Sequence, residues 1–214
     1  MEHAITIPMI FVVIPIAGYL LGSIPFGLIL AKILGGRDVR KAGSGNIGAT
    51  NVARVAGPFA GILTLILDVA KGAGAVLLAA QFSLGSTLWM MVAGLCALVG
   101  HCFPAWLKFR GGKGVATAAG VFIVMSPLAF LGAIAVFLLV VAVTRYISLG
   151  SICAAMAMPI LIYFLPAAHV PVYIVLVGAL AAAMLIVYKH GANIQRVVRG
   201  QEPKFSPGKK KAAA

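Results

Sequence analysis

Charged side chains are scarce in this sequence, and acidic ones are almost missing. Of its 214 residues, 10% are charged, against about a quarter in a soluble domain, and only 4 are Asp or Glu. With 62% apolar residues and a mean hydropathy of +1.10, the chain is neither a soluble domain nor a disordered one. The apolar residues fall into several long blocks. We therefore expect residues 1–214 to form a single integral-membrane domain, of which residues 201–214 are a basic cytoplasmic tail.

Cysteine is rare as well. The sequence has three, Cys96, Cys102 and Cys153, each isolated inside an apolar block, and it contains no CxxC pair or zinc-ligand spacing. Buried thiols of this kind behave as small apolar residues. The pattern excludes a disulfide framework and a cysteine metal cluster, and we expect neither a metal nor another cofactor.

The apolar blocks are long enough to cross a membrane, which takes about 20 helical residues. Clear candidate spans are residues 8–34, 57–81, 86–107, 148–166 and 170–188. Residues 114–144 form a further block, interrupted by Ser126-Pro127, that is long for one span and short for two.

The positions of the basic residues decide between one and two crossings of residues 114–144. With two crossings, fifteen of the 17 Lys and Arg lie on one side, two lie within spans and none lies on the other side. A single crossing divides them almost evenly. Because basic loops stay in the cytoplasm, we predict an all-α polytopic membrane protein with seven transmembrane helices, its N-terminus outside and its C-terminus cytoplasmic. The fourth and fifth spans must then be short or partly re-entrant.

The first cytoplasmic loop contains GSGNIGATN, from Gly43 to Asn51. Glycines let successive backbone N–H groups face one concavity, and such arrangements bind anions. The run matches the dinucleotide pattern GxGxxG, but no strand precedes it, and Asp68 at the expected distance lies within an apolar span. We interpret it as an anion-binding loop between two basic clusters, rather than as a dinucleotide site or a plain turn.

The second cytoplasmic loop reads KFRGGKGVAT, from Lys108 to Thr117. It departs from the P-loop pattern, because Gly114 follows the lysine and no strand precedes. Its glycines nonetheless expose the backbone, Lys113 supplies a positive charge, and the next helix begins there with free N–H groups. We predict that Lys113 binds phosphate, whereas Lys108 and Arg110 anchor the loop at lipid headgroups.

The segment after the last span carries an aligned set of polar residues. His190, Asn193 and Arg196 recur every three residues and therefore share one face of a helix. Their alignment at the end of a span favours a functional role. Glu202, one of the four acidic residues, is expected to pair with Arg196 or Arg199.

The third cytoplasmic loop, RYISLGS, is short and indicates little by itself. Ser148 and Ser151 are placed where either can cap the next helix.

Polar residues also occur inside the predicted spans. Asp68 and Lys71 lie three residues apart on one helix, where they can neutralise each other, and we interpret them as a buried structural pair. His101 is interpreted as a polar packing residue rather than a ligand.

Small residues and proline shape the first span. Gly18 and Gly22 have the GxxxG spacing of close helix packing, and Pro25 should kink the helix.

Four segments in this order resemble a known family. They are GSIPFG at 22–27, GSGNIGATNVAR at 43–54, GHCFPAWLKFRGGKGVATA at 100–118 and HGANIQR at 190–196. Together with the seven-span pattern, they are similar to the bacterial acyl-phosphate:glycerol-3-phosphate acyltransferase family, PlsY. The HxxxxD motif of the other glycerolipid acyltransferases is missing, because Trp106 stands five residues after His101.

The resemblance implies transfer of a fatty acyl group from acyl phosphate to the 1-hydroxyl of sn-glycerol 3-phosphate, at the cytoplasmic face of the bacterial inner membrane. Its partners would be these two substrates and the lipid bilayer, without nucleic acid, and the oligomeric state stays open. The implied catalytic residues are Ser44, Arg54, Lys113, His190 and Asn193. The substrate-binding residues carried over with them are Gly43, Gly45, Asn46, Gly48, Thr50, Asn51, Gly111, Gly112, Gly114, Ser151 and Arg196.

The residue chemistry leaves two mechanisms open. Acyl phosphate has a good leaving group, and the sequence has no Ser-His-Asp set, so we favour direct attack by the glycerol hydroxyl over an acylated Ser44. His190 or the substrate's own phosphate would accept the proton. The rival function is an organic-anion transporter or channel with Asp68 and Lys71 as its site, but transporters bind near the midplane, and here the polar residues gather at one face.

Overall fold

The computed structural model describes residues 3–167 and 170–205, and the elements below are those of these ranges. All of them are helices: α1 (His3–Gly22), α2 (Phe26–Gly35), η1 (Val39–Lys41), α3 (Ala49–Ala56), α4 (Pro58–Phe82), α5 (Thr87–Cys102), η2 (Ala105–Leu107), α6 (Val115–Met125), α7 (Pro127–Thr144), α8 (Ile147–Phe164), α9 (Val172–Lys189) and α10 (Gly191–Val198).

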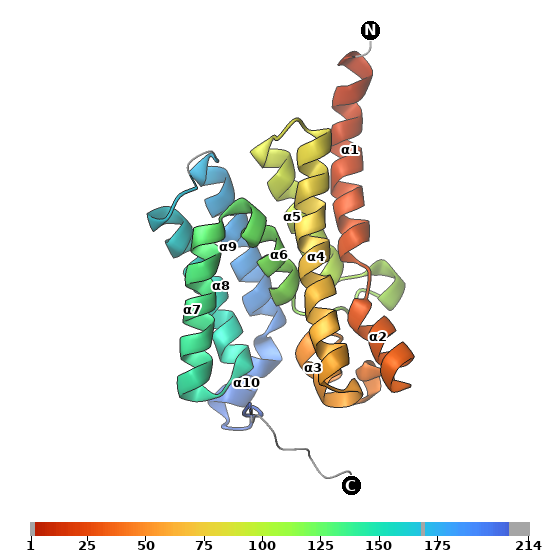
Figure 1. Cartoon of the computed structure of the whole chain (residues 1–214), viewed down its shortest axis with the longest axis vertical. Coiled ribbons are helices and arrows are strands. Elements are labelled where there is room, and N and C mark those ends of the chain that lie inside the picture. The colour runs from red at the N-terminus through yellow and green to blue at the C-terminus, as the bar shows by residue number, and fades with distance from the viewer. Residues whose placement is uncertain (1–2, 168–169, 206–214) are drawn as a thin grey trace.

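The long helices run roughly parallel or antiparallel to one another as a bundle (Figure 1). α1 and α4 pack on α5, α8 packs on α7 and α9, and α6 lies between the two groups against α4 and α7. The described chain starts at one end of the bundle and finishes at the other, where α2, α3 and α10 lie (Figure 1). We call this second end the α3–α10 end.

Six segments are long and apolar enough to cross a membrane: Phe11–Gly35, Pro58–Phe82, Thr87–Leu107, Pro127–Thr144, Ile147–Phe164 and Val172–Lys189. The expected break at Ser126-Pro127 is present, because α6 ends at Met125 and Pro127 is the first residue of α7. α6 has only 11 residues, about 16 Å at about 1.5 Å per residue. The all-α membrane class is confirmed, whereas seven complete spans and the orientation of the termini stay predictions.

The expectations for the first span are confirmed. Gly18 and Gly22 lie directly on α5, since a Cβ at these positions would be 2.6 Å from the Ala93 carbonyl oxygen and 2.0 Å from that of Ala97. Pro25 interrupts the helix completely: α1 ends at Gly22 and α2 begins after the proline.

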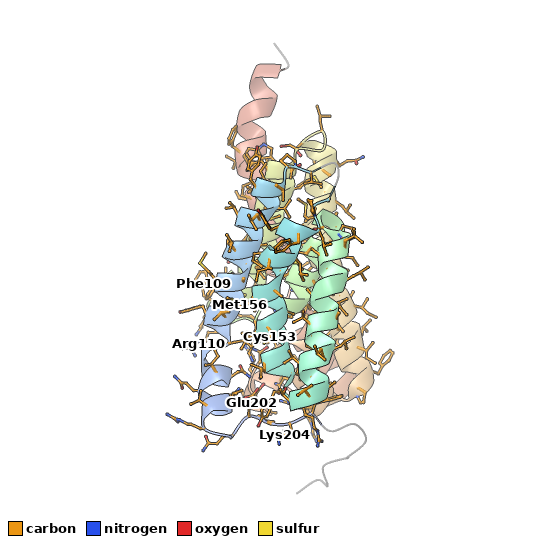
Figure 2. The ribbon with its side chains drawn as sticks, turned by 90° about the vertical axis from the view of Figure 1, so that its left-hand side faces the viewer. Phe109, Arg110, Cys153, Met156, Glu202 and Lys204 are labelled. Carbon is orange, nitrogen blue, oxygen red and sulfur yellow. The ribbon has the colours of Figure 1, made fainter. Side chains whose placement is uncertain are left out.

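The loop between α5 and α6 does not reach the end of the bundle. α5 has 16 residues against 25 in α4, and α6 is short, so the connecting residues 103–114 lie part of the way along the bundle, above α3 in Figure 1. Phe109 and Arg110 of this loop are correspondingly higher than Glu202 and Lys204 in Figure 2. The shortness of α6 thus sets this glycine-rich loop back from the α3–α10 end.

Candidate active site

One buried side chain, Asn51, holds the loop from Gly43 to Asn51 in shape. Its Oδ1 accepts a hydrogen bond from the Ser44 N–H at 2.8 Å, and its Nδ2 lies 2.8–3.1 Å from three backbone carbonyl oxygens. The side chain is 2% exposed. Because its amide is fully engaged, we expect Asn51 to shape the loop rather than to contact a substrate.

Two glycines in left-handed conformation flank the exposed Ser44. The φ angles are +61° at Gly43 and +71° at Gly45, a region that disfavours other residues. The Asn46 Oδ1 accepts a hydrogen bond from the Gly48 N–H at 2.8 Å, which closes the next turn. This conformation agrees with the expected concave loop and leaves the Ser44 hydroxyl accessible.

The first turns of α3 continue this surface. Thr50 and Arg54 are exposed and stand four residues apart, so they share a helix face. Arg54 is close enough to Lys113 to lower the pKa of that lysine. α3 therefore contributes a positive charge near Lys113.

Three glycines let the second loop pack tightly against α5. Two backbone hydrogen bonds fix the loop on α5: the Gly112 N–H donates to the His101 carbonyl at 3.0 Å, and the Gly111 N–H donates to the Cys102 carbonyl at 3.1 Å. A Cβ at Gly112 would lie 2.0 Å from His101 Nε2, and one at Gly114 would lie 2.3 Å from Leu98 Cδ1. Side chains do not fit at these glycines, so the loop exposes its backbone. Gly114 is the N-cap of α6, whose N-terminus is the positive end of the helix dipole.

Lys113 projects from this loop to Asn193 on α10, and its Nζ donates a hydrogen bond to the Asn193 Oδ1. Burial lowers the pKa of Lys113 to about 8. Repulsion from Arg196 and Arg54 acts in the same direction, and the Glu202 carboxylate opposes it. Lys113 therefore carries its charge at pH 7 close to several other cations, an arrangement that a bound phosphate group would stabilise.

The Glu202 carboxylate completes the arrangement. It accepts hydrogen bonds from Ser148 Oγ at 2.6 Å, Asn193 Nδ2 at 2.7 Å and Arg196 Nε at 2.7 Å. Burial raises the pKa of this carboxyl, but the three hydrogen bonds outweigh that effect and lower it. The expected pairing with Arg196 is confirmed. By accepting from the Asn193 Nδ2, Glu202 also turns the amide oxygen of that residue toward Lys113.

Backbone contacts hold Glu202 in place. The N–H groups of Gln201 and Glu202 donate to the Arg196 carbonyl at 2.7 and 3.2 Å. Further along, the Phe205 N–H donates to the Arg145 carbonyl at 2.7 Å, and Arg145 Nε donates back to the Phe205 carbonyl at 3.0 Å. The segment from 199 to 205 thus crosses back over the start of α8.

His190 lies at the junction of α9 and α10 and is 2% exposed. Its Nδ1 is 2.7 Å from the Ile186 carbonyl oxygen, which can only accept, so the neutral ring carries its proton on Nδ1. Burial lowers the pKa of His190 to about 4, and the positive charge of Lys113 contributes. At pH 7 the ring is therefore neutral, with Nε2 as a hydrogen-bond acceptor.

The two serines of the third loop do not cap α8, so that prediction is wrong. The N-cap position is Tyr146, and no side chain caps the helix there. Ser148 lies in the first turn and donates to Glu202 instead, while Ser151 Oγ donates to the Ile147 carbonyl at 2.9 Å. Ser151 is thereby placed on the buried face of α8.

The structure brings the expected residues together in two groups. Lys113, Asn193 and Arg196 are connected by hydrogen bonds through Glu202, a residue that was expected only to form an ion pair. Ser44 and Asn46 belong to the other group, and no hydrogen bond within residues 3–167 and 170–205 joins them to Lys113. In the same ranges no cluster of three His, Cys, Asp or Glu could hold a metal ion.

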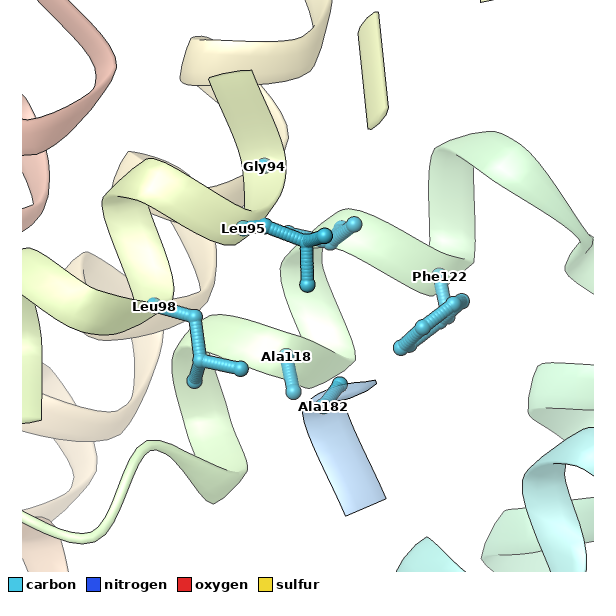
Figure 3. A pocket seen from close by; sticks show the side chains of 7 residues that line it. Gly94, Leu95, Leu98, Ala118, Phe122 and Ala182 are labelled. Atoms are coloured by element: carbon cyan, nitrogen blue, oxygen red, sulfur yellow. The ribbon is translucent and has the colours of Figure 1, made fainter. Parts of the chain in front are cut away.

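An apolar pocket lies next to the glycine-rich loop, where α5, α6 and α9 meet (Figure 3). Leu95 and Leu98 of α5, Phe122 of α6 and Ala182 of α9 line it, and Leu98 is also the residue that contacts Gly114. Its lining lacks polar side chains, so it is no site for a phosphate group.

Fold and site together define a class: a helical integral membrane protein with a cationic, glycine-rich site toward one end. Comparison with known proteins identifies the family. Residues 12–200 match the glycerol-3-phosphate acyltransferase family model. The chain belongs to this family and is an enzyme, an acyltransferase of phospholipid synthesis.

Individual relatives agree with this assignment. The chain is 50% identical over 196 residues to the glycerol-3-phosphate acyltransferase of Syntrophotalea carbinolica, covering 91% of this chain and 97% of the relative. It is 54% identical to that of Trichlorobacter lovleyi, with 89% and 95% covered. The crystal structure of PlsY, an integral membrane glycerol 3-phosphate acyltransferase, in its glycerol 3-phosphate form has a TM-score of 0.83 at 41% identity, covering 90% of this chain and 94% of that one. Its lysophosphatidic acid form has a TM-score of 0.81 at 39% identity over the same shares.

Proposed function

We propose that the protein transfers a fatty acyl group from acyl phosphate to the 1-hydroxyl of sn-glycerol 3-phosphate, giving 1-acylglycerol 3-phosphate and inorganic phosphate. The observation that carries the proposal is the Lys113–Asn193 contact beside an exposed glycine backbone, with Arg54 and Arg196 nearby. Both proposed substrates bear phosphate, and the similar solved structures are named for a glycerol 3-phosphate form and a lysophosphatidic acid form.

The two loops divide the substrates between them in this proposal. The glycine-rich loop with Lys113 binds the phosphate of glycerol 3-phosphate, helped by the N–H groups at the start of α6. The exposed loop around Ser44 and the charge of Arg54 bind the phosphate of the donor. The acyl carbonyl then lies between the loops, where backbone N–H groups and cations stabilise the negative charge of the transition state.

The reaction needs a base for the attacking hydroxyl, and the chemistry favours the acceptor's own phosphate. The hydroxyl oxygen bonds to the acyl carbon, the carbon–oxygen bond to the donor phosphate breaks, and phosphate leaves with the electron pair. His190, with a pKa of about 4, is a weak base at pH 7. A phosphate monoester, with a second pKa of about 6, is better matched to that pH.

A donor comparison tests the proposal. Purified protein in detergent is given glycerol 3-phosphate with either acyl phosphate or acyl-coenzyme A of the same chain length, and lysophosphatidic acid and phosphate are both measured. We expect equal amounts of both products with acyl phosphate and none when either substrate is omitted. If lysophosphatidic acid forms with acyl-coenzyme A as donor and not with acyl phosphate, the assignment of the donor is overturned.

The proposed site also requires the α3–α10 end to face the cytoplasm. Three of the four inner loops predicted from charge lie at this end, and the fourth, between α5 and α6, is set back from it; the α4–α5 turn at the opposite end has no basic residue. Leu84, which is 98% exposed in that turn, and Lys204 are suitable positions for single cysteines.

We expect an impermeant maleimide to label Leu84→Cys in intact cells, and to label Lys204→Cys only after the membrane is opened. The three native cysteines are replaced by alanine in both variants. Labelling of both positions from the same side would contradict the predicted odd number of crossings.

A further inference from the structure

Three ionisable side chains are buried behind the glycine-rich loop, and the proposed reaction uses none of them. Asp68 and Lys71 of α4 are 2% and 3% exposed, and His101 of α5 is 4% exposed. The Asp68 Oδ1 lies 2.8 Å from Lys71 Nζ and 3.5 Å from His101 Nδ1. A buried ion pair is weak evidence for a role in stability, because apolar residues of the same size often hold a fold together equally well.

The histidine of this cluster touches the glycine-rich loop on two sides. Its carbonyl accepts the hydrogen bond from the Gly112 N–H at 3.0 Å. Its ring lies directly against Gly112, because a Cβ there would be only 2.0 Å from Nε2. One edge of the imidazole therefore faces Asp68 and the opposite edge supports the residue that precedes Lys113.

The lysine of the cluster reaches the other loop. Lys71 Nζ donates a hydrogen bond to the Ile24 carbonyl at 2.9 Å, in the break between α1 and α2. At the start of α2, Gly27 packs on the loop that carries Ser44, since a Cβ at Gly27 would lie 1.9 Å from the Ile47 carbonyl oxygen. The cluster is thus connected to both of the loops that hold the substrates in the proposed function.

We propose that Asp68, Lys71 and His101 are positioning residues that fix the glycine-rich loop and the Ser44 loop relative to each other. This inference rests on the proposed function. Asp68 orients the His101 ring, the ring sets the position of Gly112 and hence of Lys113, and Lys71 secures the α1–α2 break under the other loop. The charges are buried because the loops need fixed, directional support, which apolar contacts do not supply.

The first test removes the charges while keeping the volume. Asp68→Asn alone would leave the buried Lys71 charge without its partner and destabilise the fold; the double variant Asp68→Asn/Lys71→Met is electrically neutral. We expect the double variant to fold, and its kcat/KM for glycerol 3-phosphate to fall about 10- to 100-fold, mainly through KM, because an ångström-scale displacement of a binding group has effects of this size. Thr64→Val is the matched control. Thr64 is buried one turn earlier on α4 and bonds only to the Ala60 carbonyl, so KM should be unchanged.

The second test exploits the contact between the ring and the loop. Gly112→Ala should impair glycerol 3-phosphate binding in the wild-type background, because the methyl group meets the His101 ring. In the His101→Ala background the same substitution should have a much smaller effect, since the space is free. Such non-additivity is the signature of direct coupling between two residues.

Binding of glycerol 3-phosphate is also measured by calorimetry without an acyl donor, so that a wrong donor assignment cannot obscure the result. A raised dissociation constant in the folded Asp68→Asn/Lys71→Met variant supports the positioning role. A wild-type dissociation constant in that variant, or an equal effect of Gly112→Ala in both backgrounds, would overturn it. Failure of turnover in the wild type, with binding intact, would count only against the proposed reaction.

Discussion

Lys113→Ala should lower kcat/KM for glycerol 3-phosphate by about 10- to 150-fold, because a hydrogen bond to a charged group contributes about 1.5–3 kcal/mol. The lysine is held by Asn193 on a loop that three glycines press against α5, so its charge has a fixed position. Most of the effect should fall on KM, as expected for a ground-state contact with phosphate. The exposed Lys108 of the same loop provides the control, and Lys108→Ala should leave KM unchanged.

The pH dependence gives this prediction a second readout. With its pKa of about 8, Lys113 is charged below that pH and loses its charge above it. Wild-type kcat/KM for glycerol 3-phosphate should therefore decline as the pH rises above about 8, and the decline should be missing in Lys113→Ala. Identical alkaline profiles for the two proteins would show that another group is responsible. His190 stays neutral throughout this range, since its pKa is about 4.

Glu202→Ala should reduce both activity and stability. The substitution leaves the hydrogen-bond donors of Ser148, Asn193 and Arg196 without their shared acceptor. Ser148 and Asn193 are buried, and each unpaired buried donor costs about 1–3 kcal/mol, whereas the partly exposed Arg196 can turn to solvent. It also frees the Asn193 amide to rotate, so that its oxygen no longer faces Lys113. We expect at least a 10-fold fall in kcat/KM together with a lower midpoint of thermal unfolding.

Two further variants separate the causes. Glu202→Gln retains an acceptor oxygen but loses the charge, and its activity should be intermediate. Gln201→Ala removes the exposed neighbour and should behave as the wild type. Activity of Glu202→Ala at the wild-type level would show that the Asn193 orientation does not depend on this carboxylate.

Local sequence patterns were sufficient for much of the fold. Pro25 and Pro127 mark interruptions, because proline lacks an N–H and clashes with the preceding turn. The break at Pro127 occurs as expected, and at Pro25 the expected kink is a complete break between α1 and α2. The Gly18–Gly22 spacing predicted a close helix contact and could not identify its partner, α5. Composition likewise predicted a membrane protein. The length of α6 could not be predicted, because it depends on where the α5–α6 loop ends, and no periodicity within the apolar block marks that position.

The site was harder to predict, since its contacts join residues far apart in the chain. Ser148 and Glu202 are 54 positions apart, and Lys113 and Asn193 are 80 apart. A serine near a helix start suggests a cap from sequence alone, and only the tertiary structure shows that its hydroxyl meets a carboxylate from the tail. The family resemblance implied that Asn51 binds substrate. Its full set of hydrogen bonds within the loop becomes visible only with the folded backbone.

The sequence did contain a signal for the importance of Glu202, namely the scarcity of acidic residues. Glu202 is one of 4 acidic residues in a chain with 17 basic ones. In such a chain, a carboxylate next to a cationic site must be paired, and its pairing orients the donors around it. The same reasoning applies to Asp68, whose second neighbour, His101, lies on another helix and was interpreted only as a packing residue.

The central claim is that the acyl group passes directly from acyl phosphate to glycerol 3-phosphate, with Ser44 only positioning the donor. Ser44 stands between two left-handed glycines, and no base is within hydrogen-bonding distance of its hydroxyl in the described ranges. Ser44→Ala should therefore slow turnover through a lost hydrogen bond, and Ser44→Thr should recover part of it if the methyl group fits.

The most direct measurement is a rapid-quench experiment in which the enzyme is mixed with acyl phosphate alone. The account predicts no burst of phosphate and no acyl ester on Ser44 by mass spectrometry, with product appearing only after glycerol 3-phosphate is added. A phosphate burst equal to the enzyme concentration, accompanied by an ester on Ser44 that forms as fast as turnover, would contradict direct transfer and make Ser44 the nucleophile.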